Sequence, residues 1–321
     1  SDVIVHLSGV NRHDNQDFIY SSNTNMCKKI ISSFRRTQFK GKLIFSSSIQ
    51  ENTSSSFGKS KKESRLLFQN WCSKNGVSFH GLIIPNVFGP FCKPNYNSFI
   101  STFSHNIIYN KKCKILVDKN IPLIYIDNLI FKILKLLKRK KSSNKINILQ
   151  DINIKVSKVL KILRIFKFEY ITNHKIPKFE SKFELNLFNT FRSYFNYNLY
   201  PVIYKNNVDN RGNFVELIRE NVGGQFSYSL TKPQIIRGNH FHTRKIERFS
   251  VLKGEAIIEF RKYGTKEKYS FHLSGDTPSF VDMPIWYTHN IKNIGKEDLI
   301  TVFWISEHYN VNDSDTYHDN V

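Results

Sequence analysis

Apolar and polar positions in the first part of the chain follow two alternating patterns. Three short, β-branched apolar runs predict buried strands, at 3–7, 42–45 and 77–84. Between them, the stretches 17–38 and 57–75 predict helices, and Gly76 supplies a stop for the second helix. Strands that alternate with helices in this way indicate βαβ units and a parallel sheet.

Small and polar residues follow each predicted strand. Ser8 and Gly9 come after the first strand, 46–48 close the second, and 85–89 follow the third. In a parallel sheet, ligands bind beyond the carboxyl ends of the strands. The first part of the chain therefore contains a candidate ligand site at that edge of its sheet.

After Asp209 the pattern changes to short strand-like runs separated by turns. The clearest runs lie at 251–260 and 299–305. Glycine-containing turns recur at 223–224, 253–254, 274–275 and 293–295. Short strands at even spacing predict an all-β sandwich or barrel.

The segment 144–200 combines helical patterns of Lys, Leu and Ile with a stretch rich in Phe, Asn and Tyr. We interpret it as the closing helices of a first domain and a connector. The predicted domains are therefore 1–200, with a parallel α/β sheet, and 201–321, with an all-β fold. A length of 321 residues allows both to bury a core.

Basic residues outnumber acidic ones by 48 to 26, which gives a formal net charge of +22. One explanation is a polyanionic partner, such as nucleic acid, an anionic membrane or a nucleotide-linked substrate. The other is compositional drift toward Lys, Asn, Ile, Phe and Tyr, which AT-rich codons encode. The Lys residues are scattered, and no basic run interleaved with aromatics forms a recognisable module. We therefore favour drift and expect no specific nucleic-acid partner.

Neither the cysteines nor the hydrophobic runs indicate an exported or membrane-spanning protein. The four Cys residues form no CxxC pair and suggest neither a disulfide framework nor a Cys zinc site. No signal peptide or long uncharged apolar run occurs, so we expect a cytoplasmic protein. The basic stretch 129–141 fits either a helix on a membrane surface or an ordinary helix with a solvated Lys face, and we favour the ordinary helix.

Four residues of the second domain are candidate metal ligands: His240, His242, Glu247 and His289. Two His residues one position apart on a strand point to the same face. Imidazole is the commonest protein ligand for divalent transition metals, and a carboxylate with a third imidazole makes a four-ligand shell. This set suits Zn²⁺, but also Fe, Mn or Ni. The alternative is a sheet whose His and Glu residues only decorate one face; four donors favour the metal site.

The spacing of these residues resembles the two signature motifs of the cupin superfamily, whose fold is a double-stranded β-helix barrel. The first motif, H-x-H-x(3,4)-E-x(6)-G, is met from His240 to Gly254. The second motif, P-x-G-x-x-H-x-x-x-N, is matched at Pro284, His289 and Asn293. The resemblance implies a cupin β-barrel at the end of the chain.

Two positions depart from the cupin pattern. Trp286 stands at the Gly position of the second motif, and Gln234 replaces a Gly that usually precedes the first His by six residues. Both departures concern turns and pocket shape rather than ligands. Because the family carries no side chain at position 286, we expect the indole of Trp286 to narrow the mouth of the barrel.

The first domain resembles the extended short-chain dehydrogenase/reductase family of nucleotide-sugar enzymes, which have a Rossmann-like sheet. The matching stretches lie at 6–9, 46–48, 57–61 and 85–89. The resemblance implies a nicotinamide cofactor held in part by Ser8, Gly9, Lys61, Pro85 and Asn86. It also implies that Ser48 polarises the substrate carbonyl, while Lys61 lowers the pKa of a catalytic Tyr and holds the nicotinamide ribose.

Two parts of this family's machinery are missing from the chain. Position 57, at the Tyr of the Tyr-x-x-x-Lys motif, is Phe, and a phenyl ring has no proton to donate. The Gly-rich phosphate-binding turn is also absent, because the chain starts near the fourth strand of the family's layout, about sixty residues into the fold. We therefore expect an incomplete Rossmann-like sheet, weakened NADPH binding and impaired reduction. A fragment, favoured by Ser1 in place of Met, and gene decay, favoured by Phe57, are both open explanations.

A reductase-like domain followed by a cupin resembles the bifunctional enzymes of bacterial capsule and O-antigen synthesis on the route to UDP-N-acetyl-L-fucosamine. Especially close stretches lie at 85–89, 92–98, 209–214 and 284–293. In that family the cupin domain epimerises C3 of a UDP-4-keto-6-deoxy-N-acetylhexosamine, and the reductase domain then reduces the C4 ketone with NADPH. The resemblance further implies Zn²⁺ or another divalent metal in the cupin domain, and a homodimer.

We therefore expect a metal-dependent C3 epimerase with an impaired reductase domain. Candidate substrate-binding residues are Arg237, Asn239, Tyr287 and Arg211. Candidates for the base that removes the C3 proton are Glu247, Tyr287 and His272. Two alternatives remain open: a catalytically degenerate sugar-nucleotide-binding relative, and a fragment of a full bifunctional reductase.

Overall fold

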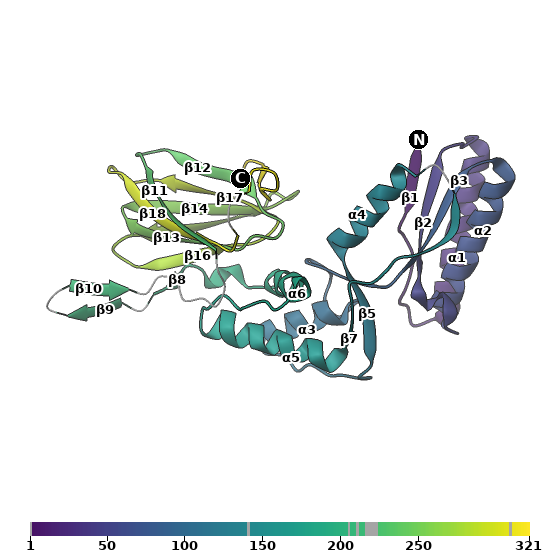
Figure 1. Cartoon of the computed structure of the whole chain (residues 1–321), viewed down its shortest axis with the longest axis horizontal. Helices are drawn as coiled ribbons and strands as arrows, with labels where there is room; N and C mark the ends of the chain where they lie inside the picture. The colour runs from purple at the N-terminus through teal and green to yellow at the C-terminus, as the bar shows by residue number, and fades with distance from the viewer. Residues whose placement is uncertain (1, 140–141, 205, 210–211, 216–223, 308–309) are drawn as a thin grey trace. The chain divides into compact units, whose positions relative to one another are not determined.

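The computed structural model describes residues 2–139, 142–204, 206–209, 212–215, 224–307 and 310–321 (Figure 1). By internal contacts, the chain forms two compact units. The first unit comprises 1–106 and 111–161, and the second comprises 107–110 and 162–321. The domain limits at 1–200 and 201–321 remain a prediction.

A four-stranded parallel sheet forms the centre of the first unit. Its order is β1 (Val3–His6), β2 (Lys42–Ser48), β3 (Ser78–Ile84) and β6 (Ser143–Asn147). The parallel sheet predicted from the alternating pattern is therefore confirmed. Strand β2 runs three residues beyond its predicted end at 45, because its serines continue the pairing with β3 as far as Ile84.

Helices cover both faces of this sheet (Figure 1). Helices α1 (Gln16–Arg36) and α2 (Ser56–Asn75) pack on one face, in a core that includes Leu43. Helix α4 (Ile126–Leu137) packs on the other face, in a core that includes Ile44. These neighbouring residues belong to different cores because successive strand side chains point to opposite faces.

The ends of the two long helices follow from their sequence. Asn15 caps α1, where its side-chain oxygen accepts hydrogen bonds from the amides of Asp17 and Phe18 at 2.8 and 3.2 Å. Ser55 caps α2 in the same way. At the other end of α2, Gly76 has a left-handed φ of 66°, which glycine adopts without strain. The predicted helix stop is therefore confirmed.

Helix α4 differs from the sequence-based expectation on its outer side. Its inner side buries Leu129 and Leu136 against the sheet, as expected of an ordinary helix. Its outer side carries Phe131 and Leu134, which are 59% and 53% exposed, in addition to basic side chains. The end of the basic stretch, 140–141, lies outside the described residues. Among the described residues, no helix combines the length and the apolar character needed to cross a bilayer.

A second sheet lies beyond the carboxyl end of β3. It contains β4 (Asn86–Phe88) and β5 (Asn120–Tyr125), which are parallel, and β7 (Ile152–Lys155), which is antiparallel to β5. The 3₁₀-helix η1 (Ile49–Asn52) follows β2, and α3 (Phe99–Ile108) follows β4. Strand β4 starts two residues after β3 ends, so the predicted ligand loop after the third strand is partly extended.

Helices account for most of the segment whose sequence pattern was mixed. They are α5 (Val156–Phe166), the π-helix η2 (Lys167–Thr172), α6 (Lys182–Arg192) and the 3₁₀-helix η3 (Tyr197–Leu199). From residue 162 onward they group by contacts with the β-rich part of the chain. The start of α5, 156–161, thus belongs to the first unit, and the later helices belong to the second.

Two five-stranded antiparallel sheets complete the second unit (Figure 1). The order in one sheet is β11 (Gln225–Thr231), β18 (Leu299–Ile305), β13 (Glu247–Lys253), β16 (Ser279–Met283) and β8 (Val202–Ile203). The order in the other is β15 (Lys268–Ser274), β14 (Glu255–Lys262), β17 (Tyr287–Asn293), β12 (Ile236–Phe241) and β19 (Tyr317–His318). A separate hairpin pairs β9 (Asn206–Asp209) with β10 (Gly212–Val215). The all-β prediction for this part is confirmed.

The run 251–260, which the pattern predicts as one strand, belongs to two strands in different sheets. Gly254 separates β13 from β14 and has a φ of 90°. Only glycine adopts this conformation readily, so the chain turns here and passes from one sheet to the other. Alternation of apolar residues continues through the turn, which is why the sequence pattern hides it.

A buried polar network joins the helical segment to the first of these sheets. Arg248 donates from Nε and Nη2 to the Asp282 carboxylate at 2.7 and 2.9 Å, and the Tyr170 hydroxyl donates to the same carboxylate at 2.8 Å. Arg248 directly follows Glu247 on β13, and successive strand side chains point to opposite faces. The network therefore anchors one face of the strand while Glu247 lies on the other.

Candidate metal centre

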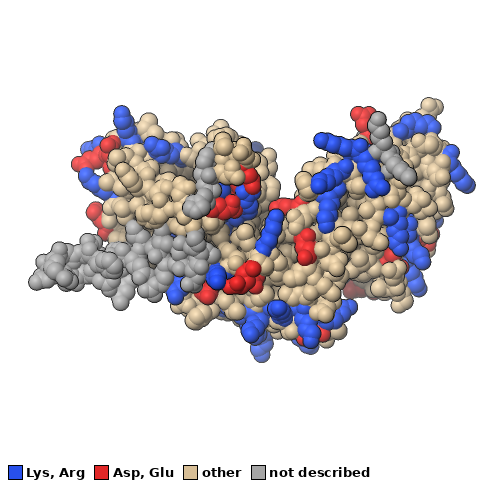
Figure 2. Space-filling model, in the orientation of Figure 1, with Lys and Arg blue, Asp and Glu red and all other residues tan. Residues whose placement is uncertain are grey.

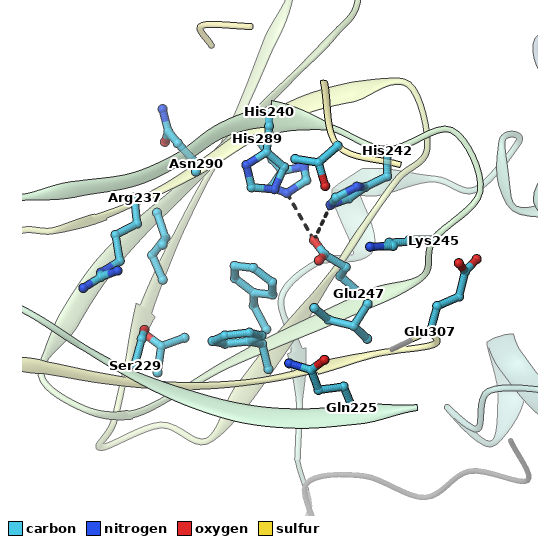
Figure 3. A pocket seen from close by; sticks show the side chains of 17 residues that line it. Gln225, Ser229, Arg237, His240, His242, Lys245, Glu247, His289, Asn290 and Glu307 are labelled. Atoms are coloured by element: carbon cyan, nitrogen blue, oxygen red, sulfur yellow. Dashed lines mark ion pairs between the residues drawn. The ribbon is translucent and has the colours of Figure 1, made fainter. Parts of the chain in front are cut away.

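The four predicted metal ligands converge at one place in the second unit (Figure 3). His240 lies on β12 and pairs directly across from His289 on β17, while Glu247 begins β13. His242 follows the end of β12. One donor atom from each of the four residues lies within 4.8 Å of the others. Residues that are 49 positions apart in sequence are thus brought together by strand pairing.

A β-bulge aims His240 into the site. The register between β12 and β17 shifts between Gly238 and His240. Gly238 has a φ of 101°, and a Cβ there would lie 2.8 Å from the carbonyl oxygen of His289. Asn239 also has a positive φ, of 58°, and its side-chain oxygen accepts a hydrogen bond from Asn290 at 3.1 Å. The bulge re-aims the strand so that both His residues reach the same site.

The charge states of Glu247 and His240 suit metal binding, whereas contact with Glu247 outweighs burial and raises the pKa of His242. Glu247 Oε2 lies 3.1 Å from His242 Nε2 and 3.3 Å from His289 Nε2. Burial alone would raise the pKa of Glu247, but its close contacts with His242 and His289 outweigh burial and hold this pKa below its usual range. Burial and the neighbouring His289 and His242 lower the pKa of His240 to about 4. At neutral pH the site therefore contains a carboxylate and a neutral imidazole, which are the forms that coordinate metals.

Backbone carbonyls orient two of the imidazoles. His289 Nδ1 lies 3.1 Å from the carbonyl oxygen of Tyr287, and His242 Nδ1 bonds to the carbonyl oxygen of Asp315. Each contact places the ring proton on Nδ1 and turns Nε2 toward Glu247. Apart from their mutual ion-pair contacts, the Nε2 atoms and Glu247 Oε2 are buried with no hydrogen-bond partner among the described residues. The donor set therefore fits a divalent metal ion, and the cluster could hold one.

The cluster forms one wall of a cavity of about 350 Å³. Apolar side chains form much of the rest, from Phe249, Ile291, Phe303 and Ile305. Polar side chains also line it, from Gln225, Ser229, Arg237, Lys245, Asn290, Thr301, Glu307 and Thr316. Figure 3 shows Lys245 close to Glu247, and Arg237 on the other side of the cavity. A site with one charged end and an apolar wall can bind a molecule that has both characters.

Not all predicted pocket residues lie at this cavity. Arg237 lines it and donates to Thr231 Oγ1 and to the carbonyl of Leu230 at 3.0 and 3.1 Å. The Tyr287 ring instead packs against Tyr197 and Phe260, at centroid distances of 5.1 and 5.6 Å, and is not among the lining residues.

The other candidates also lie elsewhere. Asn239 does not line the cavity, but its side-chain oxygen accepts a hydrogen bond from Asn290, which does. His272 is exposed on β15, 3.3 Å from Glu255. Arg211 lies outside the described residues. The expectation that Trp286 narrows the mouth of the barrel is not met. Its ring stacks on Phe241, with the ring centroids 5.5 Å apart, and Trp286 is not among the residues that line the cavity.

Sequence reasoning missed two residues beside the metal ligands. Lys245 lines the cavity and is 4% exposed. Its position between His242 and Glu247 in the motif was a signal that could have identified it, because both flanking ligands face the site. Asp315 is bonded to His242 from 73 positions away, and no spacing rule predicts such a contact.

In the first unit, three of the predicted reductase-site residues lie together. Lys61 is buried, with Nζ 6.0 Å from the centre of the Phe57 ring and 4.7 Å from the centre of the Phe45 ring. A Cβ at Gly9 would lie 3.4 Å from both Lys61 Nζ and the side-chain oxygen of Asn23. Burial lowers the pKa of Lys61 to about 8 against the opposing charge of Glu51. Asn23, which the sequence did not single out, belongs to this cluster.

The remaining reductase-site candidates lie at the ends of the strands. Ser48 ends β2, and its hydroxyl accepts a hydrogen bond from the amide of Gln50 at 3.2 Å. Asn86 begins β4 and donates to the carbonyl of Pro122 at 3.3 Å. Pro85 lies between β3 and β4, and Ser8 follows β1. Among the described residues, no hydrogen bond or ion pair joins these four to Lys61, and their roles stay predictions.

Comparison with known proteins finds a different family in each part of the chain. Residues 1–149 match the NAD dependent epimerase/dehydratase family, and residues 207–317 match the polysaccharide biosynthesis C-terminal domain. A relative from Pseudomonas aeruginosa, a UDP-2-acetamido-2,6-beta-L-arabino-hexul-4-ose reductase, is 29% identical over 98% of this chain and 85% of its own length.

Solved structures of one protein cover the whole chain. The capsular polysaccharide assembling protein CapF from Staphylococcus aureus is 31% identical, with a TM-score of 0.61, over 100% of this chain and 88% of that one. A structure of CapF with the inhibitor 3-isopropenyl-tropolone is 30% identical, with a TM-score of 0.56, over 100% of this chain and 87% of that one. The chain therefore belongs to the CapF-like family of bifunctional capsular polysaccharide enzymes, in which an NAD-dependent epimerase/dehydratase domain precedes a cupin-like polysaccharide biosynthesis domain.

Proposed function

We propose that the second unit catalyses metal-dependent epimerisation at C3 of a UDP-linked 4-keto-6-deoxy-N-acetylhexosamine. The observation that carries this proposal is the convergence of three His residues and one carboxylate within 4.8 Å at the wall of a cavity. The name of the Pseudomonas aeruginosa relative, a reductase of a UDP-linked hexulose, supports the substrate class.

The chemistry explains why a metal belongs here. A proton next to a ketone is removed only when the negative charge that develops on the ketone oxygen is stabilised. A divalent metal held by His240, His242, Glu247 and His289 would supply Lewis acidity to that oxygen. Electrostatic interactions are stronger beside an apolar wall than in bulk water, because the local dielectric constant is lower.

We propose that Lys245, in its neutral amine form, accepts the C3 proton, which leaves an ammonium group and an enolate. Among the described ionisable residues that line the cavity, four are the proposed metal ligands. Lys245 also lines the cavity and is 4% exposed, and Figure 3 shows it on the same side of the cavity as Glu247.

Lys245 is a further candidate beside those from the sequence, which stay predictions. Glu247 contacts two His residues and is itself a proposed metal ligand. Tyr287 and His272 are not among the residues that line the cavity. Arg237 keeps its proposed role as a diphosphate contact, since its guanidinium faces the cavity from the other side and can bond two oxygens at once (Figure 3).

For the first unit, we propose that C4 reduction is impaired. Phe57 lies one helical turn before Lys61, with its ring 6.0 Å from Nζ, where the resembling family has a Tyr. A phenyl ring cannot donate a proton to the C4 oxygen, and this step contributes about 10²–10⁴-fold in enzymes that use it. Lys61 and Ser48 could still contact the nicotinamide cofactor and the substrate, but the proton transfer to the C4 oxygen would not be completed.

The epimerase proposal is tested by hydrogen exchange at C3. The full chain, loaded with Zn²⁺, is incubated with the UDP-4-keto sugar in D₂O, and deuterium at C3 is measured. We expect exchange that disappears after chelation and in His289→Ala. His272→Ala is the matched control, because this exposed His is not part of the cluster. An absence of exchange in the Zn²⁺-loaded wild type would contradict the proposal and favour a binding protein.

Lys245 is tested in the same assay. Lys245→Met should reduce the exchange rate at least ~10²-fold, the usual contribution of a general base. Lys253→Met is the control, because that Lys is exposed and pairs with Glu297 on the surface. If Lys245→Met exchanges C3 at the wild-type rate while binding Zn²⁺ normally, another group moves the proton.

The reductase proposal is tested by restoring the missing hydroxyl. Phe57→Tyr should increase NADPH oxidation with the 4-keto sugar relative to the wild type. Phe45→Tyr controls for a general effect of a hydroxyl near Lys61. If both proteins oxidise NADPH with this sugar at the same measurable rate, impairment by Phe57 is wrong.

A further inference from the structure

The loop between two of the metal ligands is held by a residue far along the chain. The Asp315 carboxylate accepts hydrogen bonds from three successive amides, those of Thr243 at 3.0 Å, Arg244 at 2.9 Å and Lys245 at 3.0 Å. It also accepts a hydrogen bond from the Thr243 hydroxyl at 2.6 Å. These bonds fix the backbone that joins His242 to Glu247.

Asp315 also orients one of the ligands directly. Its carbonyl oxygen accepts a hydrogen bond from His242 Nδ1, which leaves Nε2 to face Glu247. Asp315 is 3% exposed and has a φ of 43°, in the left-handed region. This conformation directs the carbonyl to His242 and the side chain to the loop at the same time, at a cost of about 1 kcal/mol or more in backbone strain.

Residues beyond Asp315 continue this contact along the ligand strand. Strand β19 pairs with β12, with His318 opposite His240 and Tyr317 opposite Phe241. The amide of Asp319 then donates to the carbonyl of Asn239 at 3.1 Å. The segment 315–319 thus covers the edge of β12, which carries His240 and leads directly to His242.

We propose that the segment 315–319 is a latch that sets the metal affinity of the site, with Asp315 as its positioning residue. The inference rests on the metal-binding part of the proposed function. Partners that fix a ligating imidazole affect metal affinity even though they do not touch the metal. Coupling between two sites is reciprocal, so a bound metal should also hold the latch in place.

Affinity measurements on the full chain test the latch. Zn²⁺ affinity is measured by competition with a chromophoric chelator, and the coordination geometry by the visible absorption of bound Co²⁺. Asp315→Ala should bind Zn²⁺ about 10–100-fold more weakly and change the Co²⁺ spectrum. The Zn²⁺ affinity of Asp315→Asn should lie between those of Asp315→Ala and the wild type. This variant retains one acceptor oxygen for Thr243 but turns an amide NH₂ toward two backbone amides.

A matched control lies two residues earlier. Asp313 pairs with the Arg244 side chain at 2.9 Å on the surface of the same loop. Asp313→Ala removes that exposed pair but no contact to the loop backbone, so Zn²⁺ affinity should stay within about twofold of the wild type. Equal affinity in Asp315→Ala and the wild type would overturn the latch while leaving the metal site intact.

Hydrogen exchange in the wild type gives a second test that needs no variant. Zn²⁺ should slow exchange of the amides at 316–319, including the Asp319 amide that bonds to β12. If Zn²⁺ binds but leaves these amides unchanged, the latch proposal is overturned. If the wild type binds neither Zn²⁺ nor Co²⁺, both the latch and the metal-dependent function are wrong.

Discussion

At the scale of single residues, the two departures from the cupin pattern share a conformational property. Gln234 and Trp286 have φ values of 63° and 61°, in the left-handed region. Glycine, the residue that cupins carry at these positions, adopts that region without strain. A residue with a Cβ there costs about 1–2 kcal/mol. Trp286 offsets part of this cost through its contact with Phe241, whereas the Gln234 side chain is exposed.

Gln234→Gly should therefore stabilise the second unit by up to about 1 kcal/mol, because it relieves strain and removes no buried contact. The bond from the amide of residue 234 to the carbonyl of Asn293, 3.0 Å long, is kept. Urea unfolding of the two proteins measures the difference. Trp286→Gly relieves the same strain but loses the stacked indole, so it should destabilise the protein. Destabilisation by Gln234→Gly would show that its left-handed backbone is not strained.

Lys61 carries a cost that depends on pH. Burial lowers its pKa from 10.5 to about 8 in the folded state. Below pH 8 both folded and unfolded chains bind the proton, so the penalty for burying the charge is fully present. Between about pH 8 and 10.5, Lys61 is deprotonated in the folded chain but still protonated in the unfolded chain. The free energy of unfolding therefore rises with pH in this range.

Lys61→Met should therefore stabilise the first unit by about 1–3 kcal/mol at pH 7, and by less at pH 10. Hydrogen exchange of the amides of β2 and α2, measured at both pH values after correction for intrinsic rates, monitors this unit. Lys62→Met is the control, because the neighbouring Lys62 is exposed. An equal gain at both pH values would argue against burial of the charge as its cause.

At the scale of elements, strand β13 combines structural and chemical roles on its two faces. Glu247 lies in the ligand cluster, and Arg248 lies in the buried network with Asp282 and Tyr170. Tyr170 belongs to the π-helix η2, so this network fixes the helical segment against the sheet. Stability should therefore depend on the network, while metal binding should not.

Tyr170→Phe tests this separation. It removes a hydrogen bond to a carboxylate but leaves Asp282 paired with Arg248, so it should cost about 1.5–3 kcal/mol of unfolding free energy. Zn²⁺ affinity should remain unchanged. Tyr228→Phe, at a side chain that is 70% exposed, should have little effect on either quantity. A large loss of Zn²⁺ affinity in Tyr170→Phe would show that the two faces of β13 are coupled.

How much the sequence predicts differs from element to element. Local periodicity was sufficient for β1, β2 and β3, and the His-x-His spacing identified a cluster that the structure brings together. Periodicity could not reveal the turn at Gly254, since apolar alternation runs through it. It also could not assign Asp315 to the site, because that contact depends on how the chain returns along β12 rather than on any local pattern.

At the scale of the whole molecule, the two candidate sites belong to different compact units. All four proposed ligands lie in the second unit, and the Lys61 cluster lies in the first. Figure 2 shows Lys and Arg side chains at separate places on the visible face of each unit, with Asp and Glu among them. On this face the basic side chains are thus dispersed rather than gathered at one site.

Metal removal should therefore affect the two units unequally. A ligand that binds only the folded state stabilises it by about 2.7 kcal/mol at a hundred times its dissociation constant. Chelation should lower the unfolding temperature of the second unit and leave the first unchanged. Hydrogen exchange resolved by peptide distinguishes the units, and a chelator already saturated with Zn²⁺ is the control. Equal destabilisation of both units would contradict a metal confined to the second.

The proposed ligands come from both sheets of the second unit. His240 and His289 lie on β12 and β17 of one sheet, and Glu247 lies on β13 of the other. Neither sheet alone can assemble the site. The absorption of bound Co²⁺ is therefore a spectroscopic reporter of the joined sheets: on unfolding, it should vanish at the point where the sheets separate, even if each sheet keeps its own strand pairing for longer.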